Sequence, residues 1–227
     1  MVTLSGVTSG DVLVVGIAWQ FTVTSITDTR GSSFSLAVSK TGGVNDNVAI
    51  YTATLSSSGP DTVTATFSIP LQSPFEGFVY AAYDGVYVYE VAGVTTTGAA
   101  TATGSGCSSP FCGPGTSVST SSVSFPAGAF LLGMFANGCN CTVTAGTGFT
   151  LSPVPIVPTN AEYSDPVSSP TTFPATLSSA SFGWVEAGIA LNPTSPIPEY
   201  PLGLPILAIF MIIGYGLVRR RTITKQK

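Results

Sequence analysis

The segment "DTVTATFSI", residues 61–69, alternates apolar and polar side chains at every second position. Val63, Ala65, Phe67 and Ile69 would face one way, with threonine and serine facing the other, as in a strand with one buried face. Turn-forming segments such as "TGGVNDN", "SSGPD" and "YDGV" separate similar runs. We predict strands at 12–19, 22–27, 33–38, 48–55, 61–69, 77–82, 86–91, 117–123, 129–135, 141–145 and 183–191.

The composition also favours strands and turns over helices. Charged residues make up only 8% of the chain, and helix-favouring runs of Glu, Lys and Leu are missing from it. We therefore predict an all-β fold, a single antiparallel β-sandwich over residues 1–192 that is long enough to bury a core. A β-barrel is the alternative.

The C-terminal part of the chain has a different character. Residues 201–218 are an uncharged run of eighteen residues that would span roughly 27 Å as a helix, close to the thickness of a bilayer. Five of the seven basic residues follow it: Arg219, Arg220, Arg221, Lys225 and Lys227. We predict a Pro-rich linker at 193–200, a transmembrane helix at 201–218 and a basic cytoplasmic tail at 219–227. A buried C-terminal helix is the alternative.

The distribution of charge predicts the orientation of this membrane span. Residues 1–200 contain two basic and all eleven acidic residues, a net charge of 2 − 11 = −9, whereas the tail carries +5. Because positive flanking residues stay on the cytoplasmic side, the domain at 1–192 should be extracellular and the protein a single-pass protein of the cell membrane. The first residues lack the basic start of an export signal, so we expect that signal to precede Met1 or to have been removed.

The stretch "PEYPLGLPILAIFMIIGYGLVRRR" resembles the tripartite C-terminal signals of archaeal surface proteins known as PEF-CTERM or PEFG-CTERM. Pro198, Glu199 and Tyr200 match the short motif, with Tyr where these signals usually have Phe. The resemblance implies an archaeosortase-type transpeptidase as a partner, which would remove the helix and transfer the body to another anchor. A permanent single-pass anchor is the alternative.

A second resemblance covers most of residues 5–192. The order "GDVLVVGIAW", "VTSITDTRGSSFSLAV", "TVTATFSI", "AAYDGV", "AGAFLLGMFA", "TAGTGFT" and "WVEAGIAL" is similar to secreted jelly-roll-like modules of microbial surface and phage proteins. Asp28 and Gly31 match the Asp-x-x-Gly turn of that family, while Ser32 and Phe34 replace its usual Asn and Trp. The resemblance implies a jelly-roll-like sandwich and no particular activity.

Four cysteines lie in two clusters, Cys107 with Cys112 and Cys139 with Cys141. Outside the cell, an even number of clustered cysteines predicts disulfides. A bridge from Cys139 to Cys141 fits disulfide geometry poorly, so we expect Cys107 or Cys112 to pair with Cys139 or Cys141. A zinc site made by all four cysteines is the alternative, although their spacing differs from two C-x2-C pairs.

The sequence Asn140-Cys141-Thr142 is a formal acceptor for N-glycosylation. A bulky neighbouring cysteine that forms a bridge would argue against this modification.

The chain has no histidine, and its carboxylates are few and scattered, so we expect neither catalytic residues nor a cofactor. Asn45, Asp46 and Asn47 could bind calcium, but a plain turn is the simpler interpretation. The −9 body would repel nucleic acid.

Two functions of different class follow from these observations. The first is a non-enzymatic structural or adhesive module of the cell surface, with a polysaccharide or another surface protein as its partner. The second is a carbohydrate-binding module. Its aromatic and acidic side chains would stack on a sugar and accept its hydroxyl hydrogen bonds, although such residues more often pack in a core. These candidate residues are Tyr80, Tyr83, Asp84, Tyr87, Tyr89 and Glu90.

Overall fold

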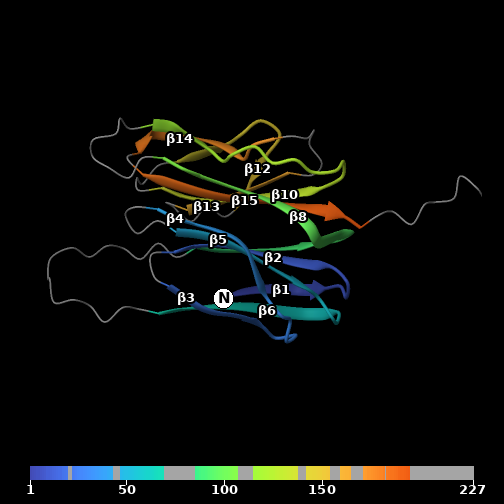
Figure 1. Ribbon diagram of the computed structural model, residues 1–227. Helices are drawn as coiled ribbons and strands as arrows, with labels where there is room; N and C mark the ends of the chain where they lie inside the picture. Colours follow the sequence, from blue (N-terminus) through green and yellow to red (C-terminus); the bar gives the residue numbers. More distant parts are fainter. Residues whose placement is uncertain are drawn as a thin grey trace, which may run out of the picture. The chain divides into compact units, whose positions relative to one another are not determined.

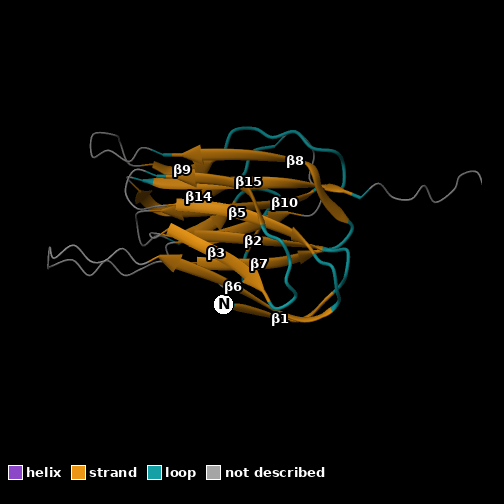
Figure 2. Cartoon of the chain, turned by 60° about the horizontal axis from the view of Figure 1, so that its bottom comes forward, coloured by secondary structure: helices purple, strands orange, loops and turns teal. Residues whose placement is uncertain are grey.

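A computed structural model describes residues 1–19, 22–42, 47–68, 85–106, 115–137, 142–153, 159–164, 171–181 and 183–194. The chain divides into two compact units, Met1–Thr194 and Ser195–Lys227, and all described residues belong to the first. Within these residues the secondary structure is strand and loop (Figure 2), and no helix there has the length and apolar character needed to cross a membrane. The expected span at 201–218 lies outside the described residues.

The described strands form four antiparallel sheets, which we call sheets A to D and which lie as successive layers in Figure 1. Sheet A has the order β1-β6-β3 and sheet B the order β4-β5-β2-β7. Sheet C has the order β12-β13-β10-β15-β8 and sheet D the order β11-β14-β9. The strands are β1 (Val2–Val7), β2 (Val12–Trp19), β3 (Thr22–Asp28), β4 (Ser35–Thr41), β5 (Asn47–Thr54), β6 (Gly59–Ser68), β7 (Gly85–Val91), β8 (Val94–Ser105), β9 (Gly115–Ser119), β10 (Phe130–Asn137), β11 (Val143–Ala145), β12 (Thr150–Leu151), β13 (Thr159–Ser164), β14 (Pro174–Ser181) and β15 (Trp184–Pro193).

The layers follow the order of the chain. Every strand of sheets A and B lies at or before Val91, and every described strand of sheets C and D begins at or after Val94. Each half of the body is therefore a two-layer sandwich, and the two sandwiches meet where sheet B packs on sheet C.

The contact between sheets B and C forms the largest cluster of buried apolar side chains. Val14 of β2 and Ile50 of β5 belong to it, together with Leu132 and Met134 of β10 and Ile189 of β15. Glycine allows close approach at one point, since a Cβ atom on Gly16 would collide with the Met134 side chain. The core of the body is thus centred between its two halves.

Sheets B and C are covered on their other faces as well. Leu13, Val15 and Ile17 of β2 pack against sheet A, where Val63 is also fully buried. On sheet C, Leu131 and Phe135 of β10 pack against residues of sheet D and its connecting loops. Strands β2, β10 and β15 are consequently buried on both faces, which explains their nearly continuous apolar sequences.

The structure confirms an all-β, antiparallel fold but differs from the expected single sandwich. A two-sheet sandwich would leave one face of β2, β10 and β15 in water, and the apolar side chains on that face require a second layer. The predicted strand at 77–82 lies outside the described residues. The other predicted strands overlap observed ones, but β1, β8, β12, β13 and β14 were not predicted.

Candidate functional site

Three of the six residues proposed to bind a sugar lie on strand β7, where Tyr87 is part of the core. Its exposed fraction is 5%, and its hydroxyl donates a hydrogen bond of 3.2 Å to the Thr159 carbonyl oxygen of β13. A sugar could not stack on this ring without displacing sheet C. Tyr87 therefore joins sheets B and C and is not available as a binding surface.

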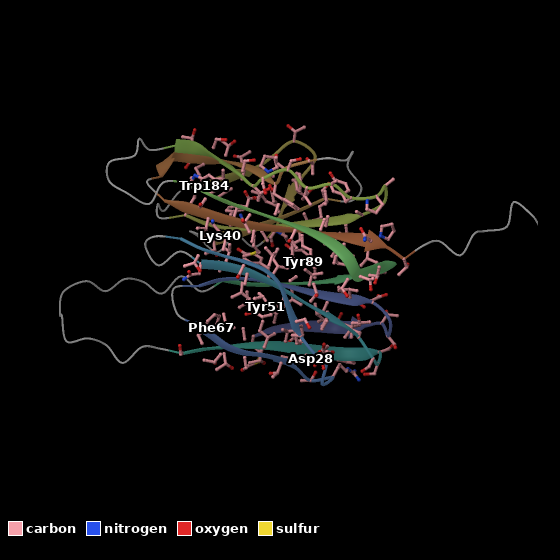
Figure 3. All side chains as sticks on the ribbon, in the orientation of Figure 1. Asp28, Lys40, Tyr51, Phe67, Tyr89 and Trp184 are labelled. Carbon is pink, nitrogen blue, oxygen red and sulfur yellow. The ribbon has the colours of Figure 1, made fainter. Side chains whose placement is uncertain are left out.

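Tyr89 lies on the same side of β7 as Tyr87 and points between sheets B and C (Figure 3). Its ring contacts that of Tyr163 in a tilted arrangement, with 5.6 Å between the centroids. Burial raises the pKa of the Tyr89 hydroxyl, while the neighbouring Ser152 side chain lowers it. The ring is thus mostly engaged in packing.

Glu90 has a local structural role. Its carboxylate accepts a hydrogen bond of 2.6 Å from the Thr8 N–H, at the start of the turn that joins β1 to β2. The remaining candidates Tyr80, Tyr83 and Asp84 lie outside the described residues. The described part of the segment therefore supplies contacts within the protein and no aromatic platform.

We expect Tyr87→Phe to lower the free energy of unfolding by about 1 kcal/mol, because the substitution removes one buried hydrogen bond and keeps the ring. Tyr51→Phe is a matched control, because the Tyr51 hydroxyl forms no hydrogen bond with the described part of the chain. Chemical denaturation of both variants measures the difference. Equal stability of the two would contradict a structural role for the Tyr87 hydroxyl.

Of the possible calcium ligands, Asn47 is the first residue of strand β5. The remaining site residues predicted from the sequence lie outside the described residues. They are Cys107, Cys112, Cys139, Cys141, Asn140, Asn45, Asp46, Pro198, Glu199, Tyr200, Arg219, Arg220 and Arg221. The disulfides, the glycosylation site and the sorting motif therefore remain predictions.

Two buried glutamates of sheet C were not singled out from the sequence. Glu162 of β13 and Glu186 of β15 are both 0% exposed. They lie on either side of β10, with Glu162 opposite Gly133 and Glu186 opposite Phe135. Because Phe135 packs against residues of sheet D, the alternation of side chains places both glutamates between sheets C and D.

Few polar groups reach this pair. The Gly146 N–H donates a hydrogen bond of 3.4 Å to Glu162 Oε2. Glu162 Oε1 and both carboxyl oxygens of Glu186 are buried without a hydrogen-bond partner in the described part of the protein. The ring of Phe173 lies against Gly133 and Gly188, which keeps the surroundings of Glu162 apolar.

This environment favours the protonated form of both side chains. Burial raises the pKa of Glu162 from 4.5 to about 8, although the hydrogen bond from Gly146 opposes the change. Burial also raises the pKa of Glu186 well above its usual value, and the charge of Glu162 raises it further. Glu162 is then mainly a neutral acid at pH 7, and the protonated form of Glu186 is favoured by the same burial.

The pair has no surface that a substrate could reach, since neither residue is exposed. Ionisation of either side chain would therefore place a charge in the apolar layer between sheets C and D. One hint of this burial was present in the sequence, because Glu186 interrupts the otherwise apolar stretch "WVEAGIAL". A strand with apolar residues on both faces is buried on both sides, so its one charged residue would be buried as well.

No three side chains of the kind that bind metals, namely histidine, cysteine, aspartate and glutamate, come together among the described residues. Comparison of the chain with protein-family models, with curated proteins and with solved structures finds no match.

Proposed function

We propose that this chain is a non-enzymatic cell-surface protein whose β-sheet body is exported and held at the envelope through its C-terminus, as a structural or adhesive module. The observation that carries the proposal is the separation of charge around residues 201–218, with −9 before this uncharged run and +5 after it. The run would form the membrane helix, and the basic residues would keep its end in the cytoplasm.

The outer face of sheet A supports an adhesive role. Because Val63 and Phe67 of β6 point toward sheet B, the intervening threonines point away from it. Thr64 lies opposite Thr27 and Thr66 opposite Ser25, and the hydroxyl oxygens of Thr3 and Thr62 are 3.1 Å apart. These residues form an uncharged sheet surface of hydroxyl groups, suited to hydrogen bonding with a polysaccharide or with another surface protein.

We also propose that the body at residues 1–192 is related to the secreted jelly-roll-like modules that its sequence resembles. The two-sheet packing within each half of the body supports it, because jelly rolls are built from two packed antiparallel sheets. The C-terminal helix at 201–218 and its handling by an archaeosortase-type enzyme are supported by the sequence of residues 198–221.

Carbohydrate binding through the segment from Tyr80 to Glu90 is the alternative. Since Tyr87 is buried and Glu90 holds a turn, Tyr80 and Tyr83 would have to provide the aromatic contacts. Loss of glycan binding in Tyr80→Ala, with binding retained in Thr64→Val, would favour this alternative. Loss in Thr64→Val alone would favour the hydroxyl face of sheet A.

The intact mass of the mature protein from the native cell surface tests how the chain is anchored. We expect the mass of a chain cleaved near Tyr200, because the Pro-Glu-Tyr motif precedes the apolar run. We expect Glu199→Ala to prevent this cleavage, so that the mass corresponds to a chain that extends to Lys227. Reduction should add about 4 Da if two disulfides are present. If the wild-type mass corresponds to a chain that extends to Lys227, the C-terminal run is a permanent anchor. Recovery of the wild-type protein and of the Glu199→Ala variant from the cytosol would contradict the proposed function.

A further inference from the structure

Three buried oxygen atoms without a hydrogen-bond partner lie at one turn of sheet A. They are Asp28 Oδ2, Asp61 Oδ2 and Ser32 Oγ. Buried polar atoms are nearly always hydrogen-bonded, so three unpaired ones at a single turn call for a partner such as a bound water or ion.

Both carboxylates hold the same turn, which follows strand β3. Asp28 Oδ1 accepts hydrogen bonds from the N–H groups of Arg30 (3.1 Å) and Ser32 (2.8 Å). Asp61 Oδ1 accepts hydrogen bonds from the N–H (3.1 Å) and the hydroxyl (2.7 Å) of Thr29. Each carboxylate therefore has one oxygen satisfied by the turn and one oxygen free, and the turn fixes the positions of both.

The sheet brings the two carboxylates to the same face. Asp28 lies opposite Val63 of β6, and Asp61 is two residues before Val63 on that strand. Since side chains alternate along a strand, Asp28 and Asp61 share the inner face of sheet A as diagonal neighbours. Figure 3 shows Asp28 at the end of this layer.

The burial of these charges is not balanced by a basic residue. Asp61 is only 1% exposed, and Asp28 is partly exposed although its Oδ2 atom is buried. Arg30 is the nearest basic residue in the chain, but its Nε donates to the Pro60 carbonyl oxygen at 3.0 Å, and its guanidinium lies against Gly59. No ion pair joins Arg30 to either aspartate in the described part of the chain.

We infer that the turn between Asp28 and Ser32 binds a calcium ion, with Asp28 Oδ2, Asp61 Oδ2 and Ser32 Oγ as its protein ligands. Oxygen atoms from carboxylates and neutral groups are the ligands that calcium prefers, and it tolerates irregular geometry. Calcium takes six to eight oxygen ligands, so water would fill the other positions. One ion would neutralise both carboxylates and satisfy the three unpaired oxygens.

The test measures the melting temperature of the whole chain in EDTA and with increasing calcium chloride. Calcium sites of extracellular modules have Kd values of roughly 0.1–1 mM, so wild type should gain about 4 °C at ten times Kd. Asp28→Asn and Asp61→Asn keep the oxygen that accepts from the turn and remove the free carboxylate oxygen. We expect both variants to lose the gain from calcium, with Asp11→Asn as the matched control that retains it.

The same series distinguishes a bound ion from a purely structural role of the carboxylates. In EDTA, Asp61→Asn should be close to wild type in stability, because the side-chain oxygen that accepts hydrogen bonds from Thr29 is retained. An equal gain with magnesium chloride would overturn the choice of calcium. No gain in wild type up to about 10 mM calcium, or the same gain in the two Asn variants, would overturn the site itself.

Discussion

Raising the pH from 5 to 8 should lower the free energy of unfolding of the body by about 3–4 kcal/mol through Glu162 alone. The Glu162 carboxyl has a pKa of about 8 in the folded protein, raised from 4.5 by burial. Between these two values the folded state binds more protons than the unfolded state, so stability falls by about 1.4 kcal/mol for each pH unit. The contribution is complete below pH 4.5 and is lost as the pH rises through 8. Glu186, whose pKa is also raised, acts in the same direction.

Urea denaturation at pH 5, 6, 7 and 8 measures this slope. Glu162→Gln keeps the shape of the side chain and cannot ionise, so the variant should lose most of the slope and be more stable than wild type at pH 8. The double variant Glu162→Gln/Glu186→Gln should show almost none of it. Glu90→Gln, which removes a carboxylate at the turn beside Thr8, controls for the change in net charge. A wild-type stability that is constant or rises from pH 5 to 8 would show that the pair is not protonated in the folded state.

Phe173→Ala should lower the free energy of unfolding by about 3–5 kcal/mol, a loss of roughly 10 °C in melting temperature. Phe173 is fully buried, and its ring contacts Phe149 with 5.6 Å between the centroids. The ring occupies the space left by two glycines that lie opposite each other in sheet C, Gly133 of β10 and Gly188 of β15. Removal of the ring leaves a cavity, because Gly133 and Gly188 have no side chains that could move into the space.

A double-mutant cycle with Gly188→Ala tests this packing. A Cβ atom on Gly188 would collide with the Phe173 ring, so Gly188→Ala should be destabilising alone and nearly neutral when Phe173 is already Ala. Phe67→Ala, a partly buried phenylalanine of sheet A, should cost less than Phe173→Ala. Additive effects of the two substitutions at 173 and 188 would mean that the ring does not fill the space above the glycine pair.

The sequence predicted strands where alternation or an apolar run was strong. Strand β2 was predicted with its observed bounds, because "VLVVGIAW" has few helix-favouring residues and lies between turns. Strand β6 was recognised from its alternating threonines, which form the outer surface of the body. In both cases the local pattern and the position in the fold agree.

Other strands depend on neighbours that the local sequence does not reveal. Strand β8 contains "TTTGAATATG", a stretch with few large apolar residues, and it is held at the edge of sheet C by its pairing with β15. Strand β13 contains Asn160 and Glu162, which a sequence pattern assigns to water but which the fold buries beneath sheet D. Glu186 interrupts an apolar run, but its pairing with Glu162 could not be predicted, because the two residues are 24 positions apart and come together only through the pairing of β13 and β15 with β10.

Sheets A and B are formed entirely by the first half of the chain, and this order affects folding during translation. When residues 1–91 have emerged, sheet B can already pair its strands, but Val14, Val48 and Ile50 on its second face have nothing to cover them until β10 and β15 arrive. Such a sheet exposes a continuous apolar surface during translation, which favours aggregation. The nascent first half therefore needs either rapid completion of the chain or a chaperone, and a fragment that ends at Val91 should accumulate as insoluble protein.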